Sequence, residues 1–481
     1  MTTTKKKVGN FRWTICSLLF FATTINYLDR QVLSLTWSDF IAPEFHWTNN
    51  DYGNITALFS IFYAVSLLFA GRLVDILDTK KGFLWAIGVW SFGACLHAFA
   101  GIATSGILTG NWLVGFEGAK NAIEKVNDTG MVISTSVTLF ILARFVLAVG
   151  EAGNFPAAIK TTAEYFPKKD RAFSTSIFNS GATVGALAAP ITIPFIAEAF
   201  GWEMSFIIIG ALGFVWMGFW VLLYDKPEKH PMVSSEELEY IQQDVIADSK
   251  LVGYVAETAT KVSLKDCFRY KQTWAFAFGK FMTDGVWWFF LFWTPAYLSS
   301  VYDMDATEAA LPLFVLYMIT LLSIIGGWLP TYFVEKKGMN PYDGRMKAML
   351  IFAFFPLLAL VAQPLGHYTY WLPVIIIGIA GAAHQSWSAN IFTTVGDMFP
   401  KKAIATVTGI GGLAGGLGST LINKGSGVLF DHAKDTNMSF MGFEGIEAGY
   451  FIIFSICAVC YLVGWTVMKT LVPKYSPITD L

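Results

Sequence analysis

The chain has 481 residues, of which 54% are hydrophobic and only 14% charged, and its formal net charge is −2. A soluble domain usually carries about 25% charged residues. The composition therefore excludes an ordinary soluble protein and predicts an all-α integral membrane protein embedded in a lipid bilayer. A net charge this close to zero gives no reason to expect a nucleic acid as partner.

Long apolar runs recur along the chain, and a helix needs about 20 residues to cross a bilayer. The runs predict twelve transmembrane helices. The predicted spans are 11–40, 52–77, 82–103, 134–165, 171–200, 204–224, 273–302, 307–334, 347–365, 370–398, 403–430 and 450–471. The lysines at positions 5–7 lead into a first span that is too long for a cleavable signal peptide.

Basic residues gather in alternate connections, for example Lys80 and Lys81, whereas intervening connections such as 42–51 hold no Lys or Arg. The positive-inside rule therefore places both termini in the cytoplasm. The charged stretch 225–272 falls on the same side, with a helix start at Ser234. The connection 106–130 falls outside, as an inserted loop or a short surface helix.

The charged stretch divides the chain into three parts. These are an N-terminal six-helix half (1–224), a cytoplasmic linker (225–272) and a C-terminal six-helix half (273–481). Two repeated halves are typical of a secondary transporter. We expect such a protein to work as a monomer.

The chain has five cysteines, and Cys457 and Cys460 show a CxxC spacing. This pair lies in an apolar span without a second pair or a nearby histidine, so buried packing is the expected role rather than metal or redox chemistry. No metal and no cofactor is predicted. No nucleophile–base–acid set emerges either, so we do not expect an enzyme.

Few charged residues fall at membrane depth, where a charge costs at least about 2.5–3.5 kcal/mol. Three are basic and three acidic: Arg30, Arg144, Lys280, Asp29, Glu151 and Asp284, while Lys424 lies toward the outer end of the eleventh span. Equal numbers indicate pairing, because unpaired buried charges are strongly destabilising. Adjacent helical positions lie about 100° apart, so at least one of Asp29 and Arg30 faces the interior.

The spacing of these charges limits their partners. Arg144 and Glu151 share a helix face but lie about 10 Å apart, too far for a local ion pair. Lys280 and Asp284 are four residues apart and could form a structural bridge, or Lys280 could bind a ligand. An aromatic run that includes Trp287 follows, as a sugar-binding wall or as lipid-facing bulk. Trp287 and Trp288 cannot both point inward.

The tenth span carries a row of polar residues at depth, including His384, Gln385 and Asn390. These residues could bind a hydroxyl-rich ligand or hydrogen-bond to neighbouring helices, and the stepping of 386, 390 and 394 along one face favours the ligand. Tyr27 and Tyr63 could add hydroxyl contacts or simply pack.

Two further patterns are better explained by mechanics. Gly71 and Asp75 end the second span beside basic residues, an arrangement that suits a gate which latches and releases. Six glycines between 409 and 418 indicate close backbone packing or a bending point in the eleventh span.

The motif at 71–75, placed after the second of twelve spans, resembles the major facilitator superfamily, although Ile76 and Asp78 replace the usual Arg and Gly. The segments 26–30 and 144–156 resemble the anion:cation symporter family. The segments 279–290 and 383–390 resemble its hexuronate branch, whereas the connection 106–130 departs from it.

The resemblance implies a bacterial inner-membrane importer that couples a sugar-acid monoanion, galacturonate or glucuronate, to protons. In such a transporter Arg30 contacts the substrate carboxylate, Asp29 and Glu151 carry the coupling proton, and Arg144 tunes those acids. A neutral buried set that accepts an anion gains one excess negative charge, which a proton removes. Alternatives are an aldonate, aromatic carboxylate or sugar phosphate symporter, or a non-transporting sugar-acid sensor.

Overall fold

The computed structural model describes residues 9–243, 263–479 and 481, and nearly all of them are helical. Each of the twelve predicted spans falls on a helix or on a run of consecutive helices. The predicted spans and helical class are therefore confirmed. The extents differ by a few residues: the span predicted at 204–224, for example, is the helix Trp202–Leu223.

Helices α1 to α10 are called here the N-terminal half. They are α1 (Phe11–Thr36), the π-helical turn η1 (Trp37–Ile41), α2 (Ala42–Phe45), α3 (Asn49–Leu77), α4 (Thr79–Ala98), α5 (Ala100–Thr109), α6 (Gly115–Ile123), α7 (Thr129–Glu151), α8 (Asn154–Tyr165), α9 (Lys168–Phe200) and α10 (Trp202–Leu223). Helices α5 and α6 occupy most of the connection that was predicted as an inserted loop or a surface helix.

The described part of the linker region holds three short helices, η2 (Pro227–Lys229), α11 (Ser235–Ile241) and α13 (Leu264–Cys267). Helices α14 to α21 are called the C-terminal half. They are α14 (Lys271–Tyr302), α15 (Ala310–Thr320), η3 (Leu321–Ser323), α16 (Ile324–Lys337), α17 (Pro341–Phe354), η4 (Phe355–Val361), α18 (Ala362–Gly366), α19 (Trp371–Met398), α20 (Lys401–Asp435) and α21 (Gly445–Leu471), with a hairpin of β1 (Ser439–Phe440) and β2 (Phe443–Glu444) before α21.

Local sequence explains where the linker helix begins and what it touches. The side chain of Ser234 accepts a hydrogen bond from the backbone N–H of Glu237 at 3.2 Å, which confirms the predicted start of α11. The Glu237 carboxylate in turn accepts from the backbone N–H groups of Phe11 and Arg12 at 3.2 and 3.0 Å. Because these are unpaired donors at the start of α1, Glu237 caps α1 and fixes the linker helix to it.

Eight helices of the described chain are long and apolar enough to cross a membrane, and a ninth is added if α4 and α5, bent by 53°, form one span. The long helices that miss this test are α1, α14 and α20. Two of them, α1 and α14, carry four of the six charged residues predicted at depth, and α20 carries the glycine-rich stretch with Lys424; the other two lie on α7, which passes the test. The mean hydropathy of these three helices is therefore lowered by charged and polar residues, which a membrane protein places in its interior and not against lipid.

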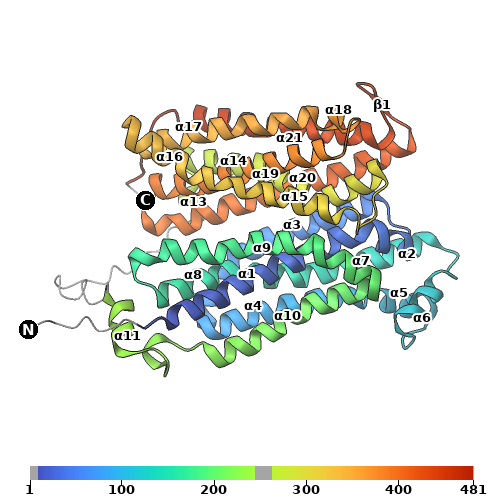
Figure 1. Cartoon of the computed structure of the whole chain (residues 1–481), viewed down its shortest axis with the longest axis horizontal. Helices are drawn as coiled ribbons and strands as arrows, with labels where there is room; N and C mark the ends of the chain where they lie inside the picture. The colour runs from blue at the N-terminus through green and yellow to red at the C-terminus, as the bar shows by residue number, and fades with distance from the viewer. Residues whose placement is uncertain (1–8, 244–262, 480) are drawn as a thin grey trace, which may run out of the picture.

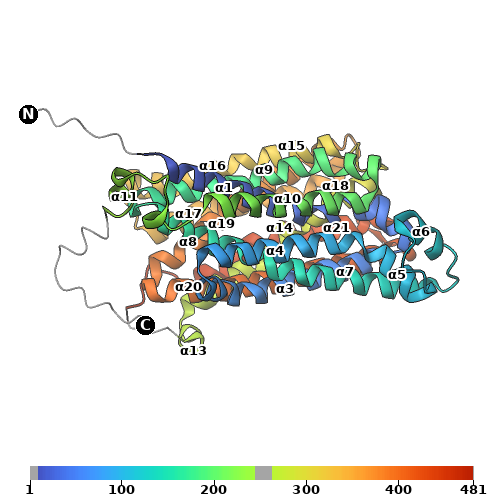
Figure 2. The same ribbon diagram turned by 90° about the horizontal axis from the view of Figure 1, so that it is seen from below.

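The two halves lie side by side along one long axis (Figures 1 and 2). In Figure 1 the blue-to-green helices form the lower layer and the yellow-to-red helices the upper one. The start of α1, helices α11 and α13 and the C-terminus lie at the left, which we call the linker end; η1, α2 and α6 lie toward the opposite, far end. The exact division at residues 224 and 273 stays a prediction.

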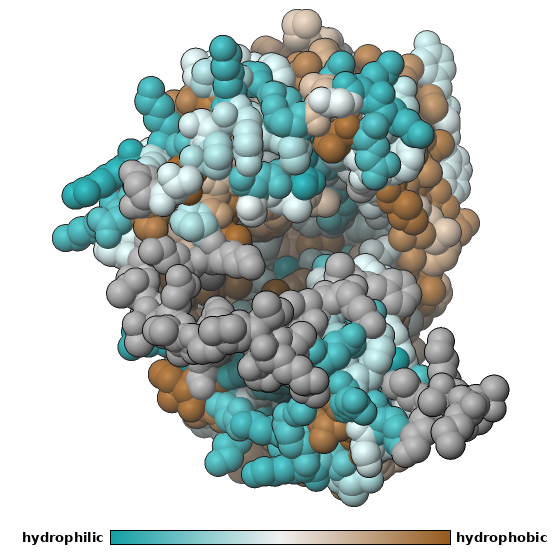
Figure 3. All heavy atoms as spheres, turned by 90° about the vertical axis from the view of Figure 1, so that its left-hand side faces the viewer, coloured by the Kyte–Doolittle hydropathy of each residue, from teal (hydrophilic) through white to brown (hydrophobic). Residues whose placement is uncertain are grey.

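The contact between the two halves differs between the linker end and the far end. Figure 3 looks onto the linker end and shows mainly hydrophilic residues on both halves, with a hollow between them where grey atoms do not cover it. Toward the far end, hydrogen bonds join the halves: Ser299 of α14 donates to Asp39 of η1 at 3.2 Å, and the Tyr52 hydroxyl donates to the backbone oxygen of Phe292 at 2.8 Å.

The glycine-rich stretch of α20 is confirmed as a close-packing surface. A Cβ added at Gly412 would lie 3.6 Å from Leu67 of α3, while one added at Gly411 or Gly418 would collide with Phe276 or Phe281 of α14. Further along, a Cβ at Gly53 of α3 would lie 2.9 Å from the backbone oxygen of Asn423. Helix α20 therefore packs backbone-close against α14 on one side and against the opposite half on the other.

Candidate functional site

A buried ion pair joins α1 to α7 in the middle of the N-terminal half. Both Nε and Nη2 of Arg30 donate to Glu151 Oε2, at 3.0 and 2.7 Å. The side chains are 6% and 0% exposed. Arg30 therefore faces the protein interior, as at least one of Asp29 and Arg30 was expected to do. Its partner, Glu151, comes from a different helix, α7. The other carboxylate oxygen, Oε1, is buried and has no hydrogen-bond partner in the described part of the chain.

Aromatic rings surround the Arg30 guanidinium. Its Cζ lies 4.7 Å from the ring centre of Tyr63, 5.2 Å from those of Tyr27 and Trp288, and 6.0 Å from that of Phe59. Rings at such distances stabilise a cation through their π faces. Since Trp288 belongs to α14, this cage contains residues of both halves.

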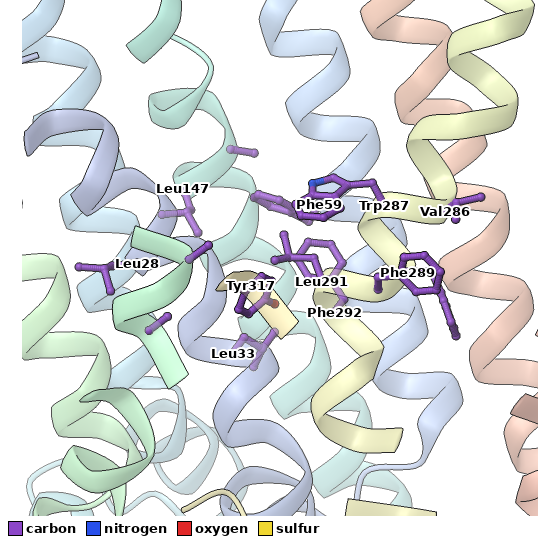
Figure 4. Close-up of a cluster of buried hydrophobic side chains, with 14 of the residues drawn as sticks. Leu28, Leu33, Phe59, Leu147, Val286, Trp287, Phe289, Leu291, Phe292 and Tyr317 are labelled. Carbon is purple, nitrogen blue, oxygen red and sulfur yellow. The ribbon is translucent and has the colours of Figure 1, made fainter. Parts of the chain in front are cut away.

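The sequence made Trp287 a candidate ring of a sugar-binding wall, whereas the structure places Trp288 over Arg30. Trp287 instead stacks on His384 within the C-terminal half, with 5.4 Å between ring centres and 3° between planes. The two adjacent tryptophans point in different directions, as the helical period requires. Figure 4 shows part of the buried apolar cluster to which Trp287 of α14 and Phe59 of α3 both belong.

Two further charges of the N-terminal half lie close by without an ion pair. Asp29 is 1% exposed, and among the described residues neither of its carboxylate oxygens has a hydrogen-bond partner. Arg144 is 3% exposed, and its Cζ lies 5.1 Å from the Phe59 ring centre; its Nη1 has no hydrogen-bond partner within residues 9–243 and 263–479. In the described chain no carboxylate lies within ion-pair distance of Arg144, so its implied tuning of Asp29 and Glu151 stays a prediction.

In the C-terminal half, Lys280 and Asp284 form the bridge that their spacing allowed. Nζ and Oδ2 are 2.7 Å apart, and the side chains are 6% and 15% exposed. Lys280 also lies 4.2 Å from the ring centre of Phe392. Its ammonium is therefore not free, and Asp284 packs against Gly415 of α20, where no side chain stands in its way.

The polar row of α19 is used mainly between helices. Asn390 Nδ2 donates to the backbone oxygens of Gly326 in α16 and Ser386, at 2.9 and 2.8 Å. His384 Nδ1 lies 2.7 Å from the hydroxyl of Tyr461 in α21. The amide nitrogen of Asn390 is thus used in helix packing in this structure, and a role of this residue in ligand binding stays a prediction. Gln385 is half-buried, and its role in binding a hydroxyl-rich ligand stays a prediction.

The predicted gate motif closes α3 at the linker end. Gly71 lies near Pro156 of α8, 3.9 Å from where its Cβ would stand. The side chain of Asp75 lies outside the described part of the structure. Asp78, three residues on, is exposed and pairs with Lys226 at 3.1 Å.

Sequence reasoning missed Phe59, Trp288 and Tyr461. A signal existed for Phe59, since it lies four positions before Tyr63 and so shares its helix face. Nothing in the local sequence marks Tyr461, because its role depends on where α21 packs against α19.

Known proteins resemble this chain along most of its length. The family model of the Major Facilitator Superfamily matches residues 19–422. The hexuronate transporter of Escherichia coli is 27% identical over 470 residues, covering 96% of this chain and 95% of the relative. The galacturonate transporter of Dickeya chrysanthemi is 26% identical over 335 residues, covering 69% of this chain and 86% of the relative.

The solved structures agree on the fold. A bacterial homologue of the human lysosomal transporter Spinster, in an inward-facing and unoccupied conformation, superposes with a TM-score of 0.68 at 17% identity and covers 98% of this chain and 100% of its own. The family resemblance read from the motifs is thereby confirmed, and the chain belongs to the Major Facilitator Superfamily of membrane transporters.

Proposed function

We propose that this chain imports a sugar-acid monoanion, a hexuronate such as galacturonate or glucuronate, together with protons. The observation that carries the proposal is the Arg30–Glu151 pair: a buried guanidinium inside an aromatic cage, held by an acid that it can exchange for a substrate carboxylate. The names of the hexuronate and galacturonate transporters that this chain resembles support the class of cargo.

Binding of the anion creates the demand for a proton. A substrate carboxylate that takes the place of Glu151 beside Arg30 leaves Glu151 buried and unpaired, next to the already unpaired Asp29. Burial without a partner penalises a charged carboxylate. Protonation of one of these acids removes the excess charge, so substrate and proton favour each other's binding.

Release follows from the two-halved architecture. The cage joins Arg30 of α1 to Trp288 of α14, so rocking of the halves takes it apart and alternately exposes Arg30 to each side. By the positive-inside rule the linker end, hollowed in Figure 3, faces the cytoplasm, with both termini there and the chain as a monomer in the bacterial inner membrane. Gly71 and Asp75 act in the gate at that end.

Proteoliposomes test the proposal. Labelled galacturonate and glucuronate should accumulate when the outside is made acidic and should compete with each other; aldonates, aromatic carboxylates and sugar phosphates should compete less. Glu151→Gln should abolish accumulation driven by the pH gradient while exchange of internal for external substrate continues. Exposed Glu124→Gln serves as the control. If Glu151→Gln still accumulates substrate with the gradient, its coupling role is wrong.

A further inference from the structure

Lys424, near the far end of α20, carries a charge that the transport mechanism above does not use. Its ammonium donates to the side-chain oxygens of Asn50 and Asn54 in α3, at 2.5 and 2.6 Å. No carboxylate in the described chain lies within ion-pair distance of it. A half-buried lysine is thus held only by neutral amides, although an acid is the usual partner of a charge in such a place.

Both amides belong to the opposite half of the molecule. Asp431, two turns further along α20, makes a second set of bonds across the same boundary: it accepts from the backbone N–H groups of Asn49 and Asn50 at 2.9 and 2.6 Å, and from Asn49 Nδ2 at 2.9 Å. It thereby caps the N-terminus of α3 from the other half. Close backbone packing of Gly427 against Asn49 brings these groups together.

All five of these hydrogen bonds join α3 to α20, so all five break if the halves part at the far end. The consequences for the two charged residues differ. Asp431 is then an acid at the rim of α20. Lys424, nearer the centre of the helix, loses both acceptors that it has in the described chain and becomes an unpaired cation at the wall of the opened passage, on the path from the outside to Arg30.

We propose that Lys424 is a switchable anion-binding residue of the outer entrance, masked by Asn50 and Asn54 when the far end is closed and available to the substrate carboxylate when it is open. The proposal rests on the proposed function in taking a sugar-acid anion as cargo. A cation masked by neutral amides suits this task, because exchange of an amide for a carboxylate favours the anion without a competing acid on the protein.

The same arrangement gives the site a direction. The anion and the asparagines compete for one ammonium, so the far end closes only after the carboxylate has moved on to Arg30. Lys424 therefore guides the anion inward and releases it on closure, whereas Arg30 holds it during the passage.

A local chemical test does not depend on the cargo. In the Asn54→Cys variant, a thiol stands beside the Lys424 ammonium, and it is treated from outside with an anionic or a cationic methanethiosulfonate of similar size. We expect a ratio of anionic to cationic labelling rates that falls about fivefold to tenfold when Lys424→Gln is added and is retained with Lys424→Arg. The wild-type protein, with its five native cysteines, gives the background. An unchanged ratio in the Lys424→Gln background overturns the proposal.

Transport supplies the second test. In proteoliposomes, Lys424→Gln should raise KM for uronate uptake about fivefold with kcat within twofold, and Lys424→Arg should restore it. Uptake by the wild type should fall as ionic strength rises from about 20 mM to about 0.2 M, and uptake by Lys424→Gln should fall less. A change in kcat alone, with the salt dependence retained, would make Lys424 a latch and not an anion-binding residue.

The two tests separate the proposals. If the wild-type protein takes up no uronate, but the Asn54→Cys variant keeps its Lys424-dependent preference for the anionic reagent, the proposed cargo is overturned and the role of Lys424 is supported. Normal uronate uptake with an unchanged labelling ratio overturns the role of Lys424 alone.

Discussion

Arg30 directs two of its N–H groups at a single oxygen of Glu151, at 3.0 and 2.7 Å, and the second oxygen of that carboxylate has no partner among the residues that the structure describes. The pair is therefore strong but incompletely satisfied. This geometry suits a contact that must break in each transport cycle, because an acid bound through one oxygen gives up its place more readily than one bound through two.

Removal of one member of this pair should cost more than removal of both. Loss of one partner of a buried ion pair typically costs about 3–5 kcal/mol, since it leaves an uncompensated charge. We expect Arg30→Met to lower the free energy of unfolding by about 3 kcal/mol and the double variant with Glu151→Met to recover most of the loss. Thermal unfolding in detergent measures both.

The control for this cycle is the exposed pair Lys226–Asp78, whose side chains are 49% and 52% exposed. Lys226→Met should cost less than about 1 kcal/mol, because an exposed pair is screened by water and salt. A double variant at Arg30 and Glu151 that is no more stable than the single ones would contradict the assignment of a tight buried pair.

The two adjacent tryptophans of α14 should behave differently. Trp288→Ala removes a ring 5.2 Å from the Arg30 guanidinium and should raise KM about tenfold, with Trp288→Phe intermediate. Trp287→Ala removes a ring stacked on His384 and should lower the thermal midpoint with less effect on KM. Uptake kinetics and thermal unfolding of both variants test these different roles of Trp288 and Trp287. Equal effects of the two substitutions on KM would contradict them.

Asn390 should act on stability rather than on substrate binding. Its side chain links α19 to the backbone of α16 through Gly326, and loss of a buried hydrogen bond costs about 1–2 kcal/mol. Asn390→Ala should lower the thermal midpoint and leave KM within twofold. A rise in KM with unchanged stability would contradict this prediction and would support Asn390 as a ligand-binding group.

A cavity of about 370 Å³ at the far end is lined by Glu44, an acid whose pKa is raised toward neutrality. Burial raises the pKa of Glu44 from near 4.5 to about 7, against the hydrogen bond from Trp202, with Glu203 nearby adding to the rise. Glu117 also raises the pKa, Lys120 lowers it, and Asp39, His46 and Glu124 line the same cavity. The folded protein therefore holds a proton on Glu44 that the unfolded chain releases above about pH 4.5.

The raised pKa of Glu44 determines how the stability of the fold changes with pH. Where the folded state binds more protons, stability falls as pH rises; for Glu44 the fall spans pH 4.5 to about 7. Glu44→Gln keeps an oxygen for Trp202 and should remove this fall, raising the free energy of unfolding at pH 8 by about 1–3 kcal/mol. Glu124→Gln, exposed in the same cavity, should not. Thermal midpoints measured from pH 5 to pH 8 test the difference; parallel curves for Glu44→Gln and wild type would contradict it.

The sequence predicted the spans and the buried charges well because both follow from the cost of placing groups in lipid. Charged residues such as Arg30 and Glu151 are rare at membrane depth, so each one stands out in the sequence and is expected to have a partner. The bridge between Lys280 and Asp284 was also predictable, since it depends only on the rise of one helix.

What the sequence could not provide were contacts between distant helices. Whether Trp287 or Trp288 covers Arg30 depends on the rotation of α14 against α1, which no local pattern determines. Likewise Asn390 had two suitable partners, a ligand or a backbone oxygen, and only the position of α16 decides between them.

The backbone-close crossing of α3 and α20 offers a way to stabilise another conformation of this protein. A Cβ added at Gly427 would stand 2.5 Å from the backbone oxygen of Asn49, and a backbone cannot move aside as a flexible side chain does. Gly427→Ala thus acts as a wedge of a single methyl group that opposes closure of the far end and spares the charged residues of the cage. If the far end faces outward, as proposed, an outward-open form for crystallography is within reach through this one position, without inhibitor or antibody.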